Sequence, residues 1–234
     1  MTSERALDQL RDVKLEIPFT NSTPGSVMIS MGQTKVLCTA SVLAEVPRWL
    51  RDSGKGWVTA EYAMLPGSSS ERVRRDHVSG GRAKEISRLI GRSLRAVVDL
   101  KAMGDTMAMV DCDVIEADGG TRTAAVTGAW IALWYAMEDA VQEGRLVKNP
   151  IIDEVAAVSV GIIDGQPTLD LDYVKDVDAE VDMNVVMSGR GLLVEVQGTA
   201  ERAPFSRVEL DQLLDLAAGG IAELHDLQRR AVAE

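Results

Sequence analysis

The segment Asp118–Thr123, which reads Asp-Gly-Gly-Thr-Arg-Thr, has the residue types of an anion-binding turn. It lies between a strand-like run and a long apolar helical pattern, where the first backbone N–H groups of the helix lack partners. The glycines let an anion approach the backbone closely, Thr121 adds a hydroxyl and Arg122 adds a positive charge. The segment indicates a phosphate site, with a purely structural tight turn as the alternative. It is not a Walker loop, because the chain contains no G-x-x-x-x-G-K-[ST] motif.

A second candidate is the window from Arg72 to Arg95, which holds eight basic residues and two acidic ones. Its net charge is +6, so the rest of the chain carries −17 of the total of −11. Most of the basic residues are arginines, whose planar guanidinium suits phosphate oxygens. A solvated face usually mixes both signs of charge, so this window favours a bound polyanion. The basic residues are Arg72, Arg74, Arg75, Arg82, Lys84, Arg88, Arg92 and Arg95.

A third candidate is the acidic stretch from Asp164 to Asp182, in which Lys175 is the only basic residue. One interpretation is a solvated acidic loop. The alternative is that two or more of these carboxylates converge to hold Mg²⁺, which prefers oxygen ligands and keeps several waters. Such acids could also manage the proton of a leaving oxygen. The acidic residues are Asp164, Asp170, Asp172, Asp176, Asp178, Glu180 and Asp182.

Other chemistries find little support. The two histidines, His77 and His225, offer no metal-ligand spacing, and a G-x-S-x-G nucleophile elbow is absent. Cys38 and Cys112 lie in apolar strand-like runs, so we expect buried, reduced thiols. Asp111 and Asp113 share one face of their strand by its period of two, which favours a structural polar pair over catalysis.

These candidates must be positioned by strands and helices that the apolar pattern predicts. Strand-like runs separated by glycine turns predict three hairpins, and a loop rich in Ser, Gly and Arg over residues 67–81 precedes the first helix. Ser206 and Glu209 form a capping-box signature at the start of the last helix. The predicted strands span 26–31, 35–42, 57–65, 106–115, 156–163, 168–171, 184–187 and 193–197, and the predicted helices span 83–100, 121–142 and 207–232.

This order predicts an α+β fold with mixed sheets packed by helices, in a single domain over residues 1–234. The repeated hairpins suggest an internal duplication. With 46% hydrophobic residues the chain is not natively disordered. Its longest uncharged apolar stretch has fifteen residues, Thr123–Met137, whereas a bilayer-spanning helix needs about 20. No secretory signal is recognisable at the amino terminus, so we expect a soluble protein in the cytoplasm with no membrane partner.

Five blocks of the sequence together resemble the bacterial ribonuclease PH family, in the same order and over about residues 10–231. They are Gly32–Ser41, Gly56–Pro66, Arg88–Arg95, Asp111–Thr123 and Asp182–Met187. The resemblance implies the ribonuclease PH-like fold and a phosphate-dependent 3′-to-5′ exoribonuclease that trims tRNA precursors. Inorganic phosphate would attack the terminal phosphodiester and release a nucleoside 5′-diphosphate, and the reverse reaction would add nucleotides. Family members assemble as a hexameric ring, a trimer of dimers.

The resemblance also implies roles for individual residues. Arg82 and the turn residues Gly120, Thr121 and Arg122 would hold the attacking phosphate. Asp176 and Asp182 would bind Mg²⁺ and assist the leaving group, with metal binding as their main role. The Arg-rich loop and helix would approach RNA, through Arg72, Arg74, Arg75, Arg88 and Arg92.

The sequence departs from the family at two places. Its amino terminus lacks the Arg-x-Asp-Gly-Arg motif, and Ala83 and Lys84 replace the Thr and Gln that follow the phosphate-binding arginine of the family. All residues assigned to chemistry remain, so we expect an active enzyme. A non-catalytic RNA-binding subunit of a similar ring is the alternative, and a diverged enzyme acting on other RNA or on nucleotides is a further one.

Overall fold

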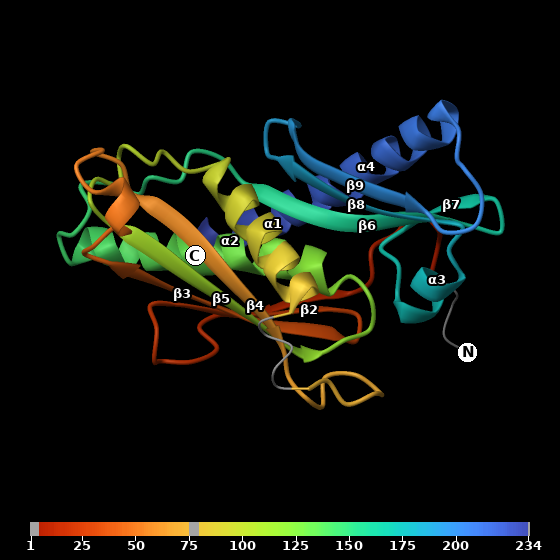
Figure 1. Ribbon diagram of the computed structural model, residues 1–234, viewed down its shortest axis with the longest axis horizontal. Coiled ribbons are helices and arrows are strands. Elements are labelled where there is room, and N and C mark those ends of the chain that lie inside the picture. Colours follow the sequence, from red (N-terminus) through yellow and green to blue (C-terminus); the bar gives the residue numbers. More distant parts are fainter. Residues whose placement is uncertain (1–4, 75–79, 234) are drawn as a thin grey trace.

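The computed structural model of the protein describes residues 5–74 and 80–233, whose strands form two sheets (Figure 1). The first sheet has the strand order β1-β2-β3-β5-β4. All neighbours in it are antiparallel except β4 and β5, which are parallel and connected through helix α1. Such a connection is expected because parallel neighbours need a crossover. The elements are β1 (Val13–Glu16), β2 (Gly25–Met31), β3 (Thr34–Leu43), β4 (Trp57–Met64), α1 (Gly81–Arg95) and β5 (Met107–Glu116).

The second sheet is antiparallel throughout and has the order β7-β6-β8-β9. A short helix, α3, lies between β7 and β8 in the chain and places its acidic residues beside that sheet. The elements are β6 (Val155–Ile163), β7 (Gln166–Leu169), α3 (Tyr173–Asp178), β8 (Val181–Ser188) and β9 (Leu193–Ala200). A single 3₁₀ turn, η1 (Arg48–Leu50), precedes β4.

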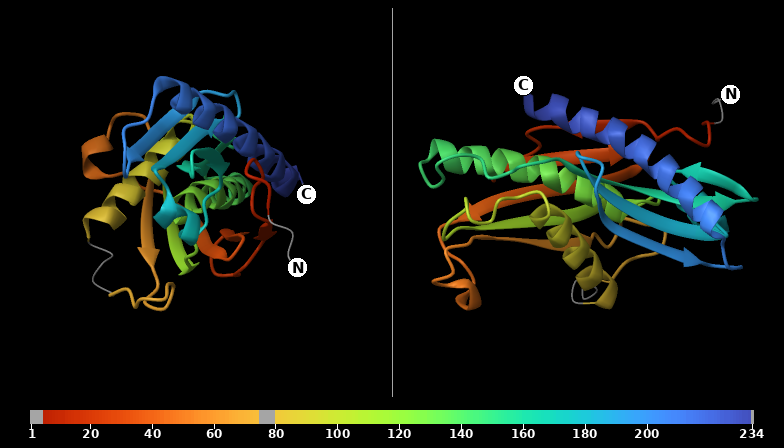
Figure 2. Two further views of the ribbon diagram at one scale, coloured as in Figure 1. Left: turned by 90° about the vertical axis from the view of Figure 1, so that its right-hand side faces the viewer. Right: turned by 90° about the horizontal axis from the view of Figure 1, so that it is seen from above.

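Helix α2 (Thr121–Gln142) joins the two sheets into one structure. It packs on β2, β3 and β5 of the first sheet and on β6 of the second, and Figure 2 shows it near the middle of the molecule. A helix enclosed in this way is apolar on nearly all sides, which explains the long apolar run. Helix α4 (Arg207–Ala233) packs on α2 and on β6, β7 and β8. One cluster of buried side chains includes residues of both sheets; the expected single domain stays a prediction.

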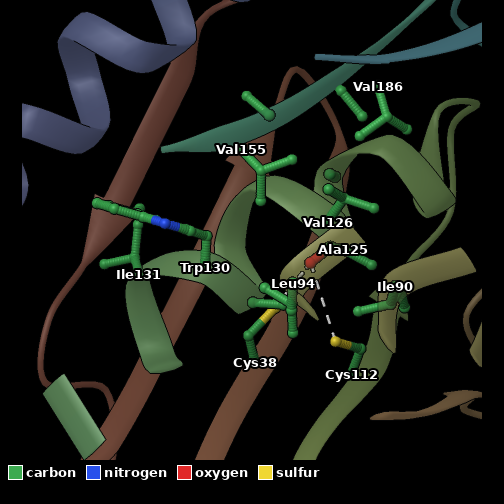
Figure 3. Packing of buried hydrophobic residues seen from close by; sticks show 14 of the residues in the cluster. Cys38, Ile90, Leu94, Cys112, Ala125, Val126, Trp130, Ile131, Val155 and Val186 are labelled. Carbon is green, nitrogen blue, oxygen red and sulfur yellow. Dashed lines mark hydrogen bonds between the residues drawn. The ribbon is translucent and has the colours of Figure 1, made fainter. Parts of the chain in front are cut away.

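The two cysteines face each other in this core. Cys38 and Cys112 are register partners on β3 and β5, and both thiols donate to the carbonyl oxygen of Ala125 in α2, at 3.8 and 3.9 Å (Figure 3). Contact with the Cys38 thiol, together with burial, raises the pKa of the Cys112 thiol. Both cysteines are buried and free, which confirms the prediction of reduced thiols.

Most predicted elements are present. The three hairpins are confirmed as β2–β3, β6–β7 and β8–β9. The capping box is confirmed too, because the N–H groups of Ser206 and Glu209 each donate to the other residue's side chain, at 2.6 and 3.2 Å. Asp111 and Asp113 share the face of β5 that is turned away from the core, as its period of two requires. No helix in the described part of the chain is long and apolar enough to cross a membrane.

The main differences from the prediction concern one helix, one strand and the acidic stretch, while β7, β8 and β9 differ from the predicted strands 168–171, 184–187 and 193–197 by up to three residues at their ends. Helix α1 begins at Gly81 and ends at Arg95, because the following residues form turns and Val98 makes a strand-like bridge to Ile151. Strand β1 was not predicted; it is short and half-exposed, and so carries little pattern. Residues 173–178 are a helix rather than part of a loop, because the Asp172 side chain accepts from the Lys175 N–H at 3.0 Å and caps it.

Candidate active site

A cavity of about 770 Å³ brings together segments from both sheets. Its lining comes from the turn before α2, the start of α1, helix α3, strand β8 and the residues that follow β9. Six residues that the sequence placed in phosphate and metal binding line this one cavity. They are Arg82, Gly120, Thr121, Arg122, Asp176 and Asp182.

The Gly-Gly turn gives the cavity its backbone donors. Gly119 and Gly120 have φ angles of +73° and +65°, a region that favours glycine. A Cβ on Gly119 would lie 2.6 Å from the carbonyl oxygen of Leu171, just before α3, so the turn also fits tightly against the second half of the chain. Arg11 Nη1 donates to the Asp118 carbonyl at 2.6 Å and Thr34 Oγ1 to that of Gly119 at 2.6 Å. The carbonyls therefore face protein donors, while the first N–H groups of α2 lie at the cavity.

Thr121 and Arg122, the first residues of α2, are each held by side chains from other elements. The Thr121 hydroxyl lies 2.8 Å from the Tyr62 hydroxyl on β4. Arg122 Nη1 donates to Gln197 Oε1 on β9 at 2.8 Å and to Glu85 Oε1 on α1 at 3.3 Å. Only 16% of the Arg122 side chain is exposed. The guanidinium is thus fixed between the two halves of the molecule.

The carboxylates of Asp176 on α3 and Asp182 on β8 form the acidic side of the cavity. Burial and the charge of Asp176 raise the pKa of Asp182 to about 6, against the opposing effect of Arg122. Burial likewise raises the pKa of Asp176, although Arg82 and Arg122 act in the opposite direction. Neither carboxylate forms an ion pair with any residue that the structure describes. Their mutual repulsion means that a bound cation would stabilise both charges.

Three other acids of the stretch, Asp164, Asp170 and Asp172, have structural positions, so the stretch is neither a uniform loop nor a uniform site. Asp170 is fully buried and receives Arg11 Nη2 at 2.7 Å, with Arg5 at 3.5 Å. Asp172 caps α3. Asp164 has a φ of +48° in the turn between β6 and β7. Proximity in sequence therefore did not distinguish the structural carboxylates from those that face the cavity.

Those arginines predicted to contact RNA that the structure describes lie outside the cavity lining. Arg72, Arg74 and Arg88 are exposed, and Arg75 lies outside the described residues. Arg92 is also exposed, but its Nε donates to Glu195 on β9 at 2.7 Å. Because α1 rises about 1.5 Å per residue, Arg88 lies roughly 9 Å along the helix from Arg82 at the cavity.

Arg95, the last basic residue of the window, has a structural position. Its guanidinium lies 4.4 Å from the centre of the Trp57 ring, and its Nη1 donates to the carbonyl of Val58 at 2.8 Å. Burial lowers the pKa of Arg95. This arginine holds α1 against β4, so it does not extend the exposed basic face.

Sequence reasoning missed several residues of the site. Asn184 lines the cavity two residues after Asp182 on the same strand, and the period of two could have indicated it. Glu201 and Arg202 also line the cavity just beyond β9. No local signal marks Tyr62 and Gln197, because their contacts depend on the packing of distant elements.

Comparison with known proteins gives matches over nearly the whole chain. Residues 9–137 match domain 1 of the 3′ exoribonuclease family, and residues 153–220 match domain 2 of the same family. A relative named Ribonuclease PH from Corynebacterium efficiens is 54% identical over 231 residues, which cover 97% of this chain and 94% of the relative.

Solved structures share the fold at low sequence identity. A chain of the Archaeoglobus fulgidus exosome with RNA bound to its active site superposes with a TM-score of 0.81 at 18% identity, covering 95% of this chain and 90% of that one. Rice Rrp46 gives a TM-score of 0.77 at 17% identity, with 97% of each chain covered. The predicted ribonuclease PH-like fold is thereby confirmed.

Proposed function

The chain belongs to the 3′ exoribonuclease family, and from this we propose that it is a phosphorolytic 3′-to-5′ exoribonuclease of the ribonuclease PH type that processes tRNA. The alternative of a non-catalytic subunit is not favoured. The observation that carries the proposal is the single cavity in which the turn before α2, Arg82 and the carboxylates of Asp176 and Asp182 meet.

The reaction joins two anions, a phosphate ion and an RNA end. An oxygen of inorganic phosphate attacks the phosphorus of the last phosphodiester, and the bond from that phosphorus to the 3′ oxygen of the preceding nucleotide breaks. That oxygen takes up a proton. The products are a nucleoside 5′-diphosphate and an RNA shortened by one nucleotide, and the reverse reaction lengthens the RNA. Catalysis of such a transfer rests chiefly on positioning and on screening of negative charge.

The phosphate side of the cavity suits the attacking ion. The N–H groups at the start of α2, the hydroxyl of Thr121 and the guanidinium groups of Arg82 and Arg122 would hold its oxygens. Arg122 is already fixed by Gln197 and Glu85, so it needs little reorganisation when phosphate binds. Gly120 is the residue before α2 and has a φ of +65°, a left-handed conformation that glycine adopts easily and from which these N–H groups begin.

The acidic side suits Mg²⁺, which takes one or two carboxylates and completes its shell with waters and substrate phosphates. Asp176 and Asp182 fit this description, since both face the cavity without an ion-pair partner among the described residues, and no larger cluster of metal-ligating side chains occurs there. They would hold the ion, which when bound would neutralise charge on the transferring phosphoryl group. In the protein itself, Asp182, whose pKa is raised, would take part in moving the proton of the 3′ oxygen.

RNA would reach the cavity along the exposed arginines, Arg72, Arg74 and Arg88, with Arg75 and Arg92 as the other predicted contacts. We further propose tRNA precursor 3′ ends as the substrate and a homo-oligomeric ring, a hexamer built as a trimer of dimers. The fold shared with exosome chains is consistent with such a ring. Location in the cytoplasm stays a prediction.

The test is release of nucleotides from a tRNA with an extended 3′ end, in Mg²⁺, with and without phosphate. We expect nucleoside diphosphates only when phosphate is present, and loss of release in Arg122→Ala. A matched control is Arg207→Ala, which removes an exposed arginine that is paired with Asp211 on α4 and does not line the cavity. Nucleoside monophosphates as products, or unchanged turnover without phosphate, would contradict the proposal.

A further inference from the structure

Among the residues that the structure describes, the Tyr62 hydroxyl reaches the cavity through Thr121 alone. Tyr62 is 3% exposed in the middle of β4, and its hydroxyl lies 2.8 Å from Thr121 Oγ1, which lines the cavity. Its backbone is held firmly on both sides. Tyr62 pairs with Cys112 on β5, and its N–H donates to Ser87 Oγ on α1 at 3.0 Å. These backbone contacts fix the position of the phenol oxygen beside Thr121.

The geometry allows either hydroxyl to donate, and hydrogen-bond accounting favours the Tyr62 phenol as the donor. A buried phenol needs an acceptor for its proton, and Thr121 Oγ1 is the only acceptor found for it among the described residues. If Thr121 donated instead, the phenol proton would be buried without a partner. With Tyr62 as the donor, Thr121 keeps its own proton free for an acceptor in the cavity.

The surroundings of the Tyr62–Thr121 pair also favour donation from Tyr62 to Thr121. Burial raises the pKa of the Tyr62 phenol, so the phenol stays protonated and remains a donor at neutral pH. Arg82 and Arg122 lie near enough to act on that phenol. These positive charges also favour an anion, whose oxygens accept hydrogen bonds and cannot donate, as the partner of the Thr121 proton.

We propose that Tyr62 is a positioning residue that donates to Thr121 Oγ1 and thereby directs the Thr121 hydroxyl proton to an oxygen of the attacking phosphate. The inference rests on the proposed function, because it takes phosphate to be the ligand of this turn. It adds a residue from the first sheet that shapes phosphate affinity without touching the ion. No bond other than hydrogen bonds forms or breaks in this step.

The experiment measures steady-state phosphorolysis of a tRNA with an extended 3′ end, varying phosphate and RNA separately. The variants are Tyr62→Phe, Thr121→Val, Thr121→Ser and the double variant Tyr62→Phe/Thr121→Val. The matched control is Tyr135→Phe, which removes a phenol that donates to the Ala231 carbonyl at 2.5 Å, away from the cavity lining. Thermal unfolding midpoints of all variants show that each is folded.

We expect Tyr62→Phe to raise KM for phosphate about five-fold, the effect of one ordinary hydrogen bond, with KM for RNA unchanged. Thr121→Val should raise it further, and the double variant should match Thr121→Val alone, because the phenol acts through that hydroxyl. Thr121→Ser keeps the hydroxyl but loses the methyl group, so it should raise KM for phosphate less than Thr121→Val does. Tyr135→Phe should leave both KM values unchanged.

Other outcomes overturn the inference in distinguishable ways. Unchanged KM for phosphate in Tyr62→Phe, with a raised KM in Thr121→Val, removes the role of Tyr62 and leaves the proposed function intact. Additive effects in the double variant, or equal changes in both KM values, assign Tyr62 a general structural role. If the wild type itself turns over without phosphate, the proposed function fails along with the inference.

Discussion

Two carboxylates of one acidic stretch, Asp170 and Asp182, have opposite surroundings. Asp170 is fully buried and receives the Arg11 guanidinium in two hydrogen bonds, of 3.0 Å from Nε and 2.7 Å from Nη2. Asp182 lines the cavity, has Asp176 as its strongest charged neighbour and forms no ion pair with a described residue. The first is neutralised within the fold, and the second is left to be neutralised by a ligand.

The same contrast holds among the arginines. Arg11 donates hydrogen bonds to Asp170 and to the carbonyls of the turn. Arg95 lies over the ring of Trp57 and donates to the carbonyl of Val58. Arg122 also has protein partners, but it lines the cavity, where its positive charge acts to lower the pKa of both carboxylates. A charged residue in this protein is thus assigned to structure or to chemistry by its partners rather than by its type.

The largest effect that tests this contrast is on activity. Asp182→Asn should lower the rate of phosphorolysis by about 10²–10⁴-fold, the usual range for a group that handles a proton, because the amide can neither hold Mg²⁺ as well nor move the proton. The measurement is nucleotide release at saturating RNA and phosphate. Activity within a few-fold of the wild type would contradict a role for Asp182 in the chemistry.

The second effect is on stability and concerns Asp170. Asp170→Asn should lower the free energy of unfolding by about 3 kcal/mol, because the buried Arg11 charge loses its partner. Asparagine keeps the backbone conformation, since it tolerates the positive φ of +54° at this position. Urea unfolding measures the loss, and Asp211→Asn, at an exposed pair with Arg207, should change it by no more than about 0.5 kcal/mol. Equal losses in the two variants would show that burial of the pair is irrelevant.

A smaller effect has the opposite sign. The pKa of Asp182 is raised from its ordinary value of 3.8 to about 6, so its ionisation lowers the stability of the folded state progressively between about pH 4 and pH 6, and by the full amount above pH 6. In the metal-free protein, Asp182→Asn should therefore gain stability at pH 8, by less than the roughly 3 kcal/mol that such a shift allows because solvent partly screens the site, and almost none at pH 4. Urea unfolding in EDTA at both pH values checks this, and a loss of stability at pH 8 would assign Asp182 a structural role.

The smallest effect separates two arginines of α1. Arg88→Ala should weaken RNA binding and lower the salt dependence by about one counterion, whereas Arg92→Ala should do so less. The reason is that Arg92 is already engaged by Glu195. Filter binding of a tRNA precursor over a range of salt concentrations measures both. A larger effect of Arg92→Ala would mean that RNA displaces Glu195.

Local pattern was enough to predict much of the fold and part of the site. The turn at Gly119 and Gly120 could be predicted from the sequence, because adjacent glycines directly before an apolar helix are typical of a turn at the start of that helix. The acidic stretch was ambiguous, because nothing in its sequence shows that Arg11, 159 residues away from Asp170, removes one acid from the candidates. Tyr62 was likewise not predicted, because its contact with Thr121, 59 positions away, leaves no local pattern. Residues that act through a distant neighbour become visible only when the sheets and helices are assembled.

We propose that phosphate, held at the start of α2, attacks RNA in this cavity. The most direct measurement follows ³²P-labelled inorganic phosphate into the products of a tRNA with an extended 3′ end. We predict that the label appears in the β-phosphate of the released nucleoside diphosphates, one per nucleotide removed, and that Arg122→Ala abolishes the incorporation. Unlabelled nucleoside monophosphates as the products would contradict the account.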